Sequence, residues 1–166
     1  MNLFMEKNKN YRQNVAAIVV DGNQKMLICA RCDLPYVWQI PQGGVNDGEA
    51  PEVAVLRELK EEIGTDNVEV IAKFPHTIKY LFPEEQKASK NKNFKAYYDG
   101  QEQTYFLVKI NDISQINIRA FFPQEFINVA WVSGGEFLDK VIGFKKEAYT
   151  QAIEYCLEHF PQHLKR

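Results

Sequence analysis

Residues 43–65 read GGVNDGEAPEVAVLRELKEEIGT, a paired-glycine turn followed by a stretch with helical periodicity. Pro51 suits a first helical turn and Gly64 suits a helix end, so we expect a helix over 51–63. Three glutamates, three and four positions apart, share one side of that helix: Glu58, Glu61 and Glu62. Apolar residues lie nearly opposite them, namely Leu56, Leu59 and Ile63. The stretch therefore predicts one helix with a core face and a separate carboxylate face.

A carboxylate face on a helix has two possible explanations. On a solvated surface, like-charged neighbours cost only about 0.2–0.5 kcal/mol per pair, and such faces are common. In a cleft with an effective dielectric constant of about 20, carboxylates ~5 Å apart repel by about 3 kcal/mol per pair, and a cation is needed. Divalent ions that prefer oxygen ligands are the natural counter-charge. The helix alone leaves both explanations open.

The spacing around the helix favours the metal site. After Gly43 come five residues and Glu49, then seven residues and Arg57-Glu58-Leu59, followed by Glu61-Glu62 and Gly64. This pattern resembles the Nudix box, and its seven near-fixed positions match by chance on the order of once in 10⁸ starting points. One position departs from the family pattern, because Thr65 stands where an aliphatic residue is usual.

The resemblance extends over nearly the whole chain and narrows the branch of the family. Two positions depart from the pattern of the branch that comprises bacterial RNA 5′-pyrophosphohydrolases and dinucleoside polyphosphate hydrolases. Gln13 stands in place of a proline, and Cys32 stands in place of an arginine that contacts the base in some members. The blocks similar to bacterial RNA 5′-pyrophosphohydrolases and dinucleoside polyphosphate hydrolases are 11-YRQNV-15, 38-WQIPQGG-44, 100-GQEQTYF-106, Glu125-Phe126 with Trp131-Val132, and 144-FKKEAY-149.

This resemblance implies a Nudix fold of the α/β class, a mixed β-sheet sandwiched between helices (α/β/α). It also implies Mg²⁺, with Mn²⁺ as an alternative, bound by Gly43 through its carbonyl and by Glu58, Glu61, Glu62 and Glu125. Arg57 would pair with Glu49 and hold the helix and the glycine loop in register. The catalytic residues implied are Glu58, Glu62, Glu125 and Arg57, with Glu125 as a further ligand or the general base.

Substrate contacts are implied by the same resemblance. Arg12, Tyr80 and Lys145 would lie near phosphates, while Ile142 and Phe144 would flank a base by stacking. Aromatic residues are commonly buried, so Tyr80 and Phe144 are equally well explained as core residues. Glu125 also has a plain alternative, since an isolated loop glutamate is common on any surface.

The implied function is metal-dependent hydrolysis of nucleoside 5′-polyphosphate anhydrides. It comprises removal of pyrophosphate from 5′-triphosphorylated RNA, a step of mRNA decay, and cleavage of dinucleoside polyphosphates such as diadenosine tetraphosphate. Two alternatives remain open: cleansing of oxidised nucleoside triphosphates, and a non-catalytic Nudix module that senses nucleotides or RNA. The intact carboxylate set argues against the second, because a sensing module does not need it.

Composition sets the outer limits. The 166 residues fit one domain, 1–166, with a folded core over about 11–160. A net charge of −2 argues against a protein that coats nucleic acid. We expect a nucleotide or an RNA 5′ end as partner, and neither a membrane, DNA nor an obligate protein partner. Neither a signal peptide nor an apolar run that could span a bilayer is visible, so the cytoplasm is the expected location.

Further elements are expected from pattern alone. The periodicity predicts a hairpin over 15–20 and 26–30, strands at 68–74, 105–110 and 129–132, and a helix over 145–160. The lysine-bearing stretch 84–95 is expected to be a loop, either a solvated insertion or a functional lid. Cys29 and Cys32 form a Cys-x-x-Cys pair without a second pair, so packing is expected rather than metal binding.

Overall fold

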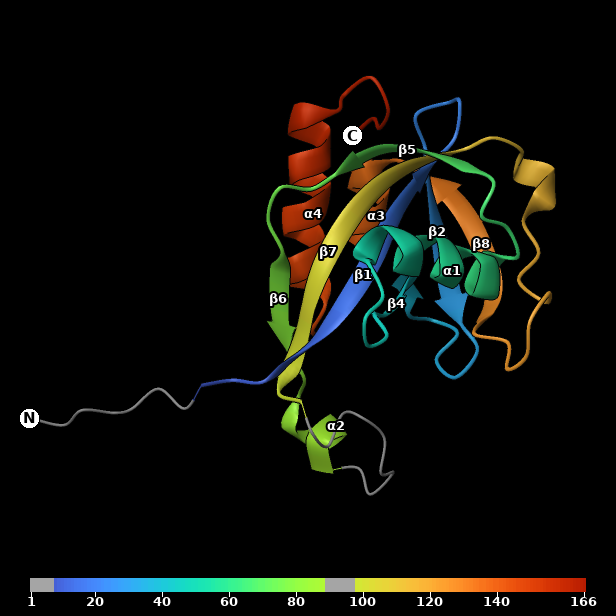
Figure 1. Cartoon of the computed structure of the whole chain (residues 1–166). Helices are drawn as coiled ribbons and strands as arrows, with labels where there is room; N and C mark the ends of the chain where they lie inside the picture. Colours follow the sequence, from blue (N-terminus) through green and yellow to red (C-terminus); the bar gives the residue numbers. More distant parts are fainter. Residues whose placement is uncertain (1–7, 89–97) are drawn as a thin grey trace, which may run out of the picture.

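The computed structural model describes residues 8–88 and 98–166, in which a mixed β-sheet lies between helices (Figure 1). β1 and β7 run parallel over the whole of β1, and the other described strand pairs are antiparallel. This arrangement confirms the predicted α/β class and mixed sheet. The strands are β1 (Tyr11–Val20), β2 (Met26–Arg31), β3 (Trp38–Gln39), β4 (Gln42–Gly44), β5 (Val68–Lys73), β6 (Ile78–Leu81), β7 (Gly100–Ile110) and β8 (Phe126–Val132).

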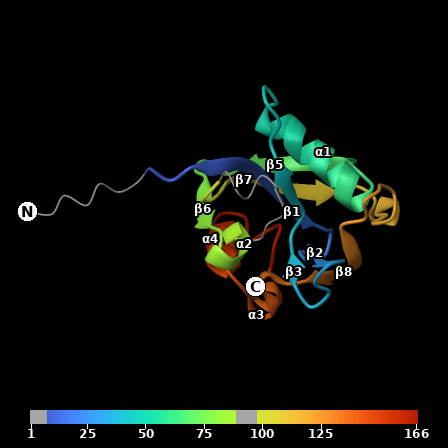
Figure 2. The same ribbon diagram turned by 90° about the horizontal axis from the view of Figure 1, so that it is seen from below.

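Helices cover both faces of the sheet. Figures 1 and 2 show from two directions that α1 lies on one face, while α3 and α4 lie on the other. The predicted sandwich of a sheet between helices is therefore confirmed. The longer helices are α1 (Pro51–Ile63), α3 (Gly134–Lys140) and α4 (Lys146–His159), and the short ones are α2 (Glu84–Ala88) and a 3₁₀ turn (Ile113–Gln115).

Strand β1 supplies side chains to two separate hydrophobic cores, because successive residues of a strand point to opposite faces. Its even-numbered residues from Ala16 to Val20 pack in the core under α3 and α4. Its odd-numbered residues from Val15 to Val19 pack against α1. The run is therefore apolar without alternation, as expected for a strand that is buried on both sides.

Helix α1 follows the sequence prediction to the residue. It begins after Ala50, which provides no side-chain cap, with Pro51 in its first turn. It ends at Gly64, whose φ of 80° is the left-handed conformation that glycine adopts most readily. Leu59 and Ile63 are fully buried against β1, so the core face predicted from the periodicity is confirmed.

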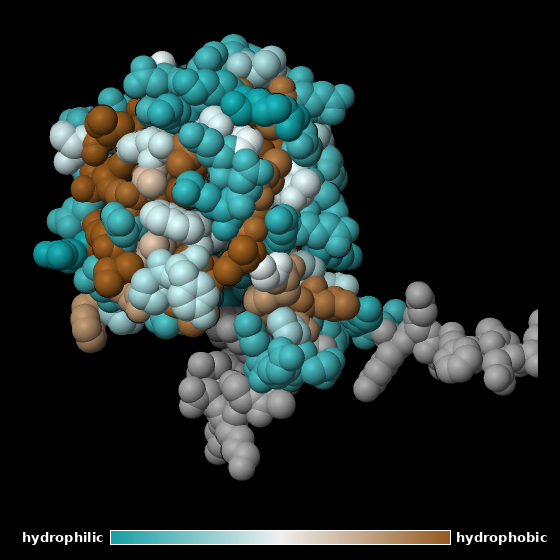
Figure 3. Space-filling view, turned by 180° about the vertical axis from the view of Figure 1, so that it is seen from behind, coloured by the Kyte–Doolittle hydropathy of each residue, from teal (hydrophilic) through white to brown (hydrophobic). Residues whose placement is uncertain are grey.

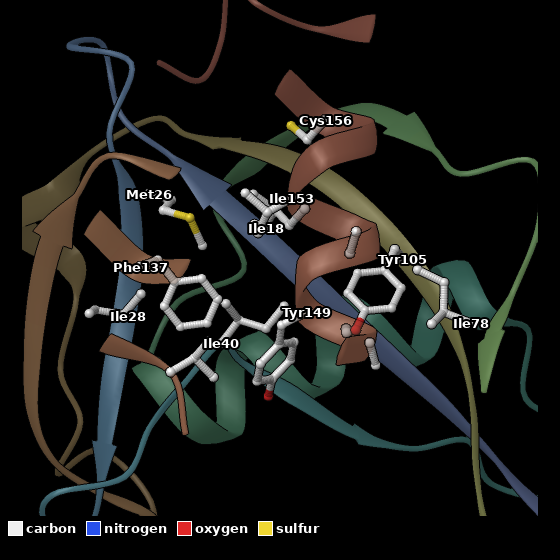
Figure 4. Close-up of a cluster of buried hydrophobic side chains, with 14 of the residues drawn as sticks. Ile18, Met26, Ile28, Ile40, Ile78, Tyr105, Phe137, Tyr149, Ile153 and Cys156 are labelled. Carbon is white, nitrogen blue, oxygen red and sulfur yellow. The ribbon is translucent and has the colours of Figure 1, made fainter. Parts of the chain in front are cut away.

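The core beneath α3 and α4 includes Ile40, Phe137 and Tyr149 (Figure 4). The rings of Phe137 and Tyr149 pack with their centroids 5.4 Å apart, and both belong to the same buried cluster as Ile40. Tyr149 enters this core from α4, and its hydroxyl group continues toward β4. The C-terminal helix therefore supports the residues that precede the paired glycines.

Several boundaries differ from the prediction. Strands β7 and β8 begin at Gly100 and Phe126, before the predicted starts. The predicted loop over 84–95 is wrong for its first five residues, which form α2, with Glu84 and Glu85 in the first turn, where acidic residues favour a helix. Residues 89–95 lie outside the described residues. Helix α4 matches the predicted 145–160 to within one residue at each end.

Two cysteines of the Cys-x-x-Cys pair have different environments. Cys29 is buried in the core against α1, so packing is confirmed for it. Cys32 is exposed because β2 ends at Arg31, and packing was the wrong prediction for this residue.

Figure 3 shows the molecule from behind, with hydrophobic side chains reaching the surface in patches separated by hydrophilic ones. In the described ranges, no helix has both the length and the apolar character needed to cross a membrane.

Gly100 opens β7 at a point where the neighbouring strand leaves no room for a side chain. A Cβ there would lie 1.9 Å from the carbonyl oxygen of Tyr80 and 2.9 Å from the Cα of Leu81. Because these are backbone atoms, we expect Gly100→Ala to lower the free energy of unfolding by about 2–3 kcal/mol. Gly22→Ala is the matched control, since nothing lies within 4 Å of its Cβ position. Urea denaturation of both variants checks this, and equal midpoints would contradict it.

Candidate active site

A cleft of about 650 Å³ opens beside α1, β4 and the first residues of β1. It collects residues that are far apart in the sequence. Arg57 and Glu49 are not among the residues that line it, and Ile142 lines an adjoining cavity instead. The predicted site residues that line the cleft itself are Arg12, Gly43, Glu58, Glu61, Glu62, Tyr80, Glu125, Phe144 and Lys145.

The three helix glutamates project into this cleft to different depths. Glu62 is only 4% exposed, and its Oε2 accepts a hydrogen bond from the backbone N–H of Gln42 at 3.1 Å. Burial raises the pKa of Glu62 well above its ordinary value, and the nearby carboxylates of Glu125 and Glu58 raise it further. Burial also raises the pKa of Glu58. A glutamate this deeply buried rules out the solvated-surface explanation of the helix.

Arg57 ties the helix to the glycine turn. Its Nε and Nη2 donate to the two carboxylate oxygens of Glu49 at 2.7 and 2.9 Å, and Nη2 also donates to the carbonyl of Gly44 at 2.8 Å. Its Nη1 donates to Glu58 at 2.7 Å. The guanidinium lowers the pKa of Glu49 to about 2, chiefly through the hydrogen bonds. One side chain thus holds two loop groups and a cleft carboxylate in fixed relation.

The paired glycines allow two charged groups to approach the backbone closely. A Cβ on Gly43 would lie 1.9 Å from the carboxyl carbon of Glu58. A Cβ on Gly44 would lie 2.1 Å from Nη2 of Arg12. Any side chain at either position would displace a cleft residue, which explains why the sequence has glycine at both.

The lining of the cleft also combines cations with aromatic rings. Among the described residues, three cations line the cleft, Arg12, Arg31 and Lys145, and burial lowers the pKa of Arg12. The Lys145 ammonium donates to the side-chain carbonyl of Gln39 at 3.3 Å. The ring of Phe144 lies 5.7 Å from that of Tyr80, which is both buried in the core and part of the cleft lining. The two explanations of Tyr80 are therefore compatible.

Polar residues beneath the cleft form a connected set that the sequence did not reveal. The Tyr149 hydroxyl donates to Oε1 of Gln42 at 2.5 Å, and the Gln42 amide is 3.5 Å from the hydroxyl of Tyr80. The Tyr80 hydroxyl in turn donates to Gln101. Gln42 and Gln101 fall within blocks that carry the family resemblance. The resemblance therefore marked these two residues, but it did not indicate what they do.

Glu125 reaches the cleft from the loop before β8. Its side chain is exposed, and its backbone carbonyl accepts from the N–H of Cys32 at 2.9 Å. Within residues 8–88 and 98–166, no hydrogen bond to its carboxylate is found. Ile142 lies apart from these groups, in a cavity of about 190 Å³ that shares Phe144 and Lys145 with the cleft.

The donor set fits a hard divalent cation. Among the described residues, no three His, Cys, Asp or Glu side chains converge closely enough to hold an ion as they stand. Arg57 donates to Oε1 of Glu58, and the Gln42 N–H donates to Oε2 of Glu62, so one oxygen of each carboxylate is already engaged. The donors of the predicted metal site are all oxygens, and the carboxylate of the buried Glu62 has two like charges, Glu125 and Glu58, nearby. Oxygen-rich, negatively charged sites of this kind suit Mg²⁺ or Mn²⁺.

Comparison with known proteins identifies the class. The family model described as the NUDIX domain matches residues 10–152, and the chain therefore belongs to the Nudix family. The RNA pyrophosphohydrolase of Nitratiruptor sp. is 46% identical over 156 residues, covering 91% of this chain and 96% of that protein. The RNA pyrophosphohydrolase of Campylobacter jejuni is 45% identical over 159 residues, covering 93% and 97%.

The fold is also similar to solved structures. The dihydroneopterin triphosphate pyrophosphohydrolase of E. coli superposes with a TM-score of 0.63 at 17% identity, covering 89% of this chain and 99% of that one. At this identity the likeness supports the fold alone.

Proposed function

We propose that this chain hydrolyses phosphoric anhydrides of nucleoside 5′-polyphosphates. It removes pyrophosphate from 5′-triphosphorylated RNA and cleaves dinucleoside polyphosphates such as diadenosine tetraphosphate. The observation that carries the proposal is a cleft whose lining combines the carboxylates of α1 with Arg12 and Lys145. The RNA substrate is supported by relatives that are named RNA pyrophosphohydrolases and align over nearly the whole chain.

The proposed cofactor is Mg²⁺, with Mn²⁺ as an alternative. Glu58, Glu61 and Glu62 would hold it together with the carbonyl of Gly43, and Glu125 would serve as a further ligand or as the general base. When bound, the ion would supply neutralisation of the phosphate charge and would help to activate a water, which are the two requirements of anhydride hydrolysis.

The protein's own groups position the substrate and handle the proton. Arg12 and Lys145 bind phosphate oxygens, and Phe144 with Ile142 flanks a base. Glu58 and Glu62 are engaged by Arg57 and by the Gln42 N–H, whereas the Glu125 carboxylate is exposed at the cleft. Glu125 is therefore the group best placed to accept the proton of the attacking water.

Release of pyrophosphate from 5′-triphosphorylated RNA tests the proposal directly. We expect release with Mg²⁺ and none with excess EDTA. Values of kcat/KM on diadenosine tetraphosphate and on an oxidised nucleoside triphosphate, measured side by side, rank the substrates. No hydrolysis of any substrate would indicate a sensing module, and a clear preference for the oxidised nucleotide would indicate nucleotide cleansing.

Arg57→Lys is expected to lower kcat/KM by about 10- to 100-fold with the fold retained. A lysine ammonium is a single point charge and cannot span Glu49, the Gly44 carbonyl and Glu58 together. Arg166→Lys is the matched control, because Arg166 makes a similar double contact with Glu154 at the surface, away from the cleft. Steady-state kinetics and thermal melting measure both variants. Equal activity of the two variants would show that the multiple hydrogen bonds of the Arg57 guanidinium are dispensable for activity.

The remaining expectations form part of the same proposal. The chain acts as one domain over residues 1–166, in the cytoplasm, on a nucleotide or an RNA 5′ end. It does so without a membrane, DNA or an obligate protein partner. Cell fractionation and sedimentation of the purified chain test these points.

A further inference from the structure

Two loops leave the sheet side by side at the edge of the cleft. Arg31 at the end of β2 is the sheet partner of Phe126 at the start of β8. The next residues stay together, since the Cys32 N–H donates to the Glu125 carbonyl at 2.9 Å. The loop after β2 and the loop before β8 therefore start from the same end of these strands (Figure 1).

Both loops carry aromatic side chains that the core does not use. Tyr36 is 67% exposed on the first loop, and Phe121 and Phe122 are 44% and 97% exposed on the second. We call these three residues the aromatic lip. Both loops also contribute residues to the lining of the cleft. These residues are Cys32 and Asp33 on the first loop and 123–125 on the second, so the aromatic lip is continuous with the cleft along the chain.

The chemistry of the lip suits single-stranded nucleic acid. Exposed rings offer surfaces on which successive bases stack, and this contact tolerates any base sequence. Arg119 is exposed three residues before Phe122 on the same loop and supplies a positive charge for the phosphate backbone. A double-stranded segment fits less well, because its bases are already stacked on one another.

A protein partner is the weaker explanation of the same surface. A stable protein interface buries about 800 Å² on each partner, far more than three loop side chains provide. The lip also borders a cleft whose proposed substrate is a chain that continues beyond the cleft.

We propose that the aromatic lip binds the single-stranded RNA that follows the 5′ end, with bases stacked on Phe122 and Tyr36. This inference rests on the proposed function, because it requires the 5′ polyphosphate of an RNA to lie in the cleft. The aromatic lip would contact RNA substrates but not a free nucleotide or a dinucleoside polyphosphate.

Phe122→Ala tests the inference with two substrates of different length. On an unstructured 5′-triphosphorylated decamer we expect kcat/KM to fall about 5- to 30-fold, as the loss of one stacked base implies. On a 5′-triphosphorylated dinucleotide we expect no change. A 97% exposed side chain contributes little to the fold, so the variant should melt like the parent. An equal fall on both substrates, or no fall on either, would overturn the inference.

Further variants separate stacking from other contacts. Phe122→Trp should keep the preference for the decamer, and Phe122→Leu should lose it, because leucine is apolar but has no ring. Full activity of the leucine variant would overturn stacking. Ile113→Ala is the control, since Ile113 is 58% exposed on the same connection but is separated along the chain from residues 123–125, which line the cleft. Sedimentation of the parent and of Phe122→Ala tests self-association, and a parental dimer that this substitution dissociates would also overturn the inference.

A binding measurement separates this inference from the proposed function. Fluorescence anisotropy with the 5′-triphosphorylated decamer in excess EDTA reports the lip without any hydrolysis. We expect Phe122→Ala to weaken this binding several-fold. Unchanged binding by Phe122→Ala would overturn the role of the aromatic lip, even if the parent hydrolyses RNA. Weakened binding by Phe122→Ala, together with no hydrolysis by the parent, would refute only the proposed reaction.

Discussion

Replacing Glu62 with glutamine is expected to lower kcat/KM on 5′-triphosphorylated RNA by about 10²- to 10⁴-fold and to leave the protein folded. Glutamine has nearly the same size and keeps an oxygen that accepts from the Gln42 N–H. It removes the negative charge that the proposed cation requires. The carboxylate is buried next to the charges of Glu125 and Glu58, so its charge destabilises the metal-free fold. We therefore expect the thermal midpoint without Mg²⁺ to stay the same or to rise.

This opposite response of activity and stability distinguishes a functional carboxylate from a structural one. Glu52→Gln is the matched control, because Glu52 lies on the same helix but is exposed and paired with Lys73 at 2.7 Å. It should change neither quantity appreciably. Parental kcat/KM in a folded Glu62→Gln protein would refute the role of the α1 carboxylates.

Gly43→Ala should lower kcat/KM by about 10²-fold with little loss of stability. The added Cβ would lie 1.9 Å from the carboxyl carbon of Glu58, so this side chain must move. The atoms displaced are the flexible end of a side chain, in contrast to the backbone atoms next to Gly100. The variant should therefore fold normally and hold Glu58 in the wrong place.

The neighbouring glycine provides the comparison for this variant. An alanine at Gly44 would displace the Arg12 guanidinium instead of a carboxylate. We expect Gly43→Ala to raise the Mg²⁺ concentration needed for half-maximal activity, and Gly44→Ala to raise KM for the substrate. Titrations of Mg²⁺ and of substrate for both variants test this. An identical response of the two variants would contradict the conclusion that Gly43 makes room for Glu58 and Gly44 makes room for Arg12.

Local patterns predicted the parts of the structure that depend on neighbours in the sequence. Helix α1 was correct to the residue because Pro51, Gly64 and the apolar spacing all act within one helix. Helix α3 was missed although Ser133 and Glu136 form a capping box, a signal that lies in the sequence itself. Strands β3 and β4 are two and three residues long, too short for periodicity to reveal.

Features that depend on tertiary packing could not be predicted in this way. The hydrogen bond between Gln42 and Tyr149 joins residues 107 positions apart, and neither residue shows a pattern of its own. Cys32 was expected to pack, but the strand ends one residue earlier and leaves it at the cleft. The resemblance pairs Ile142 with Phe144, and no local pattern could show that both residues line a cavity adjoining the cleft.

The hydrogen bonds of Gln42 indicate that the carboxylate helix depends on the rest of the fold and cannot be transferred alone to another protein. Tyr149 on α4 holds the Gln42 side chain, and the Gln42 backbone holds the Glu62 carboxylate on α1, so a line of hydrogen bonds crosses from one helical layer to the other. A Nudix box grafted onto another scaffold would lack this anchor even with every carboxylate in place. Likewise, deletion of the C-terminal helix would disturb a proposed metal ligand on the opposite side of the molecule.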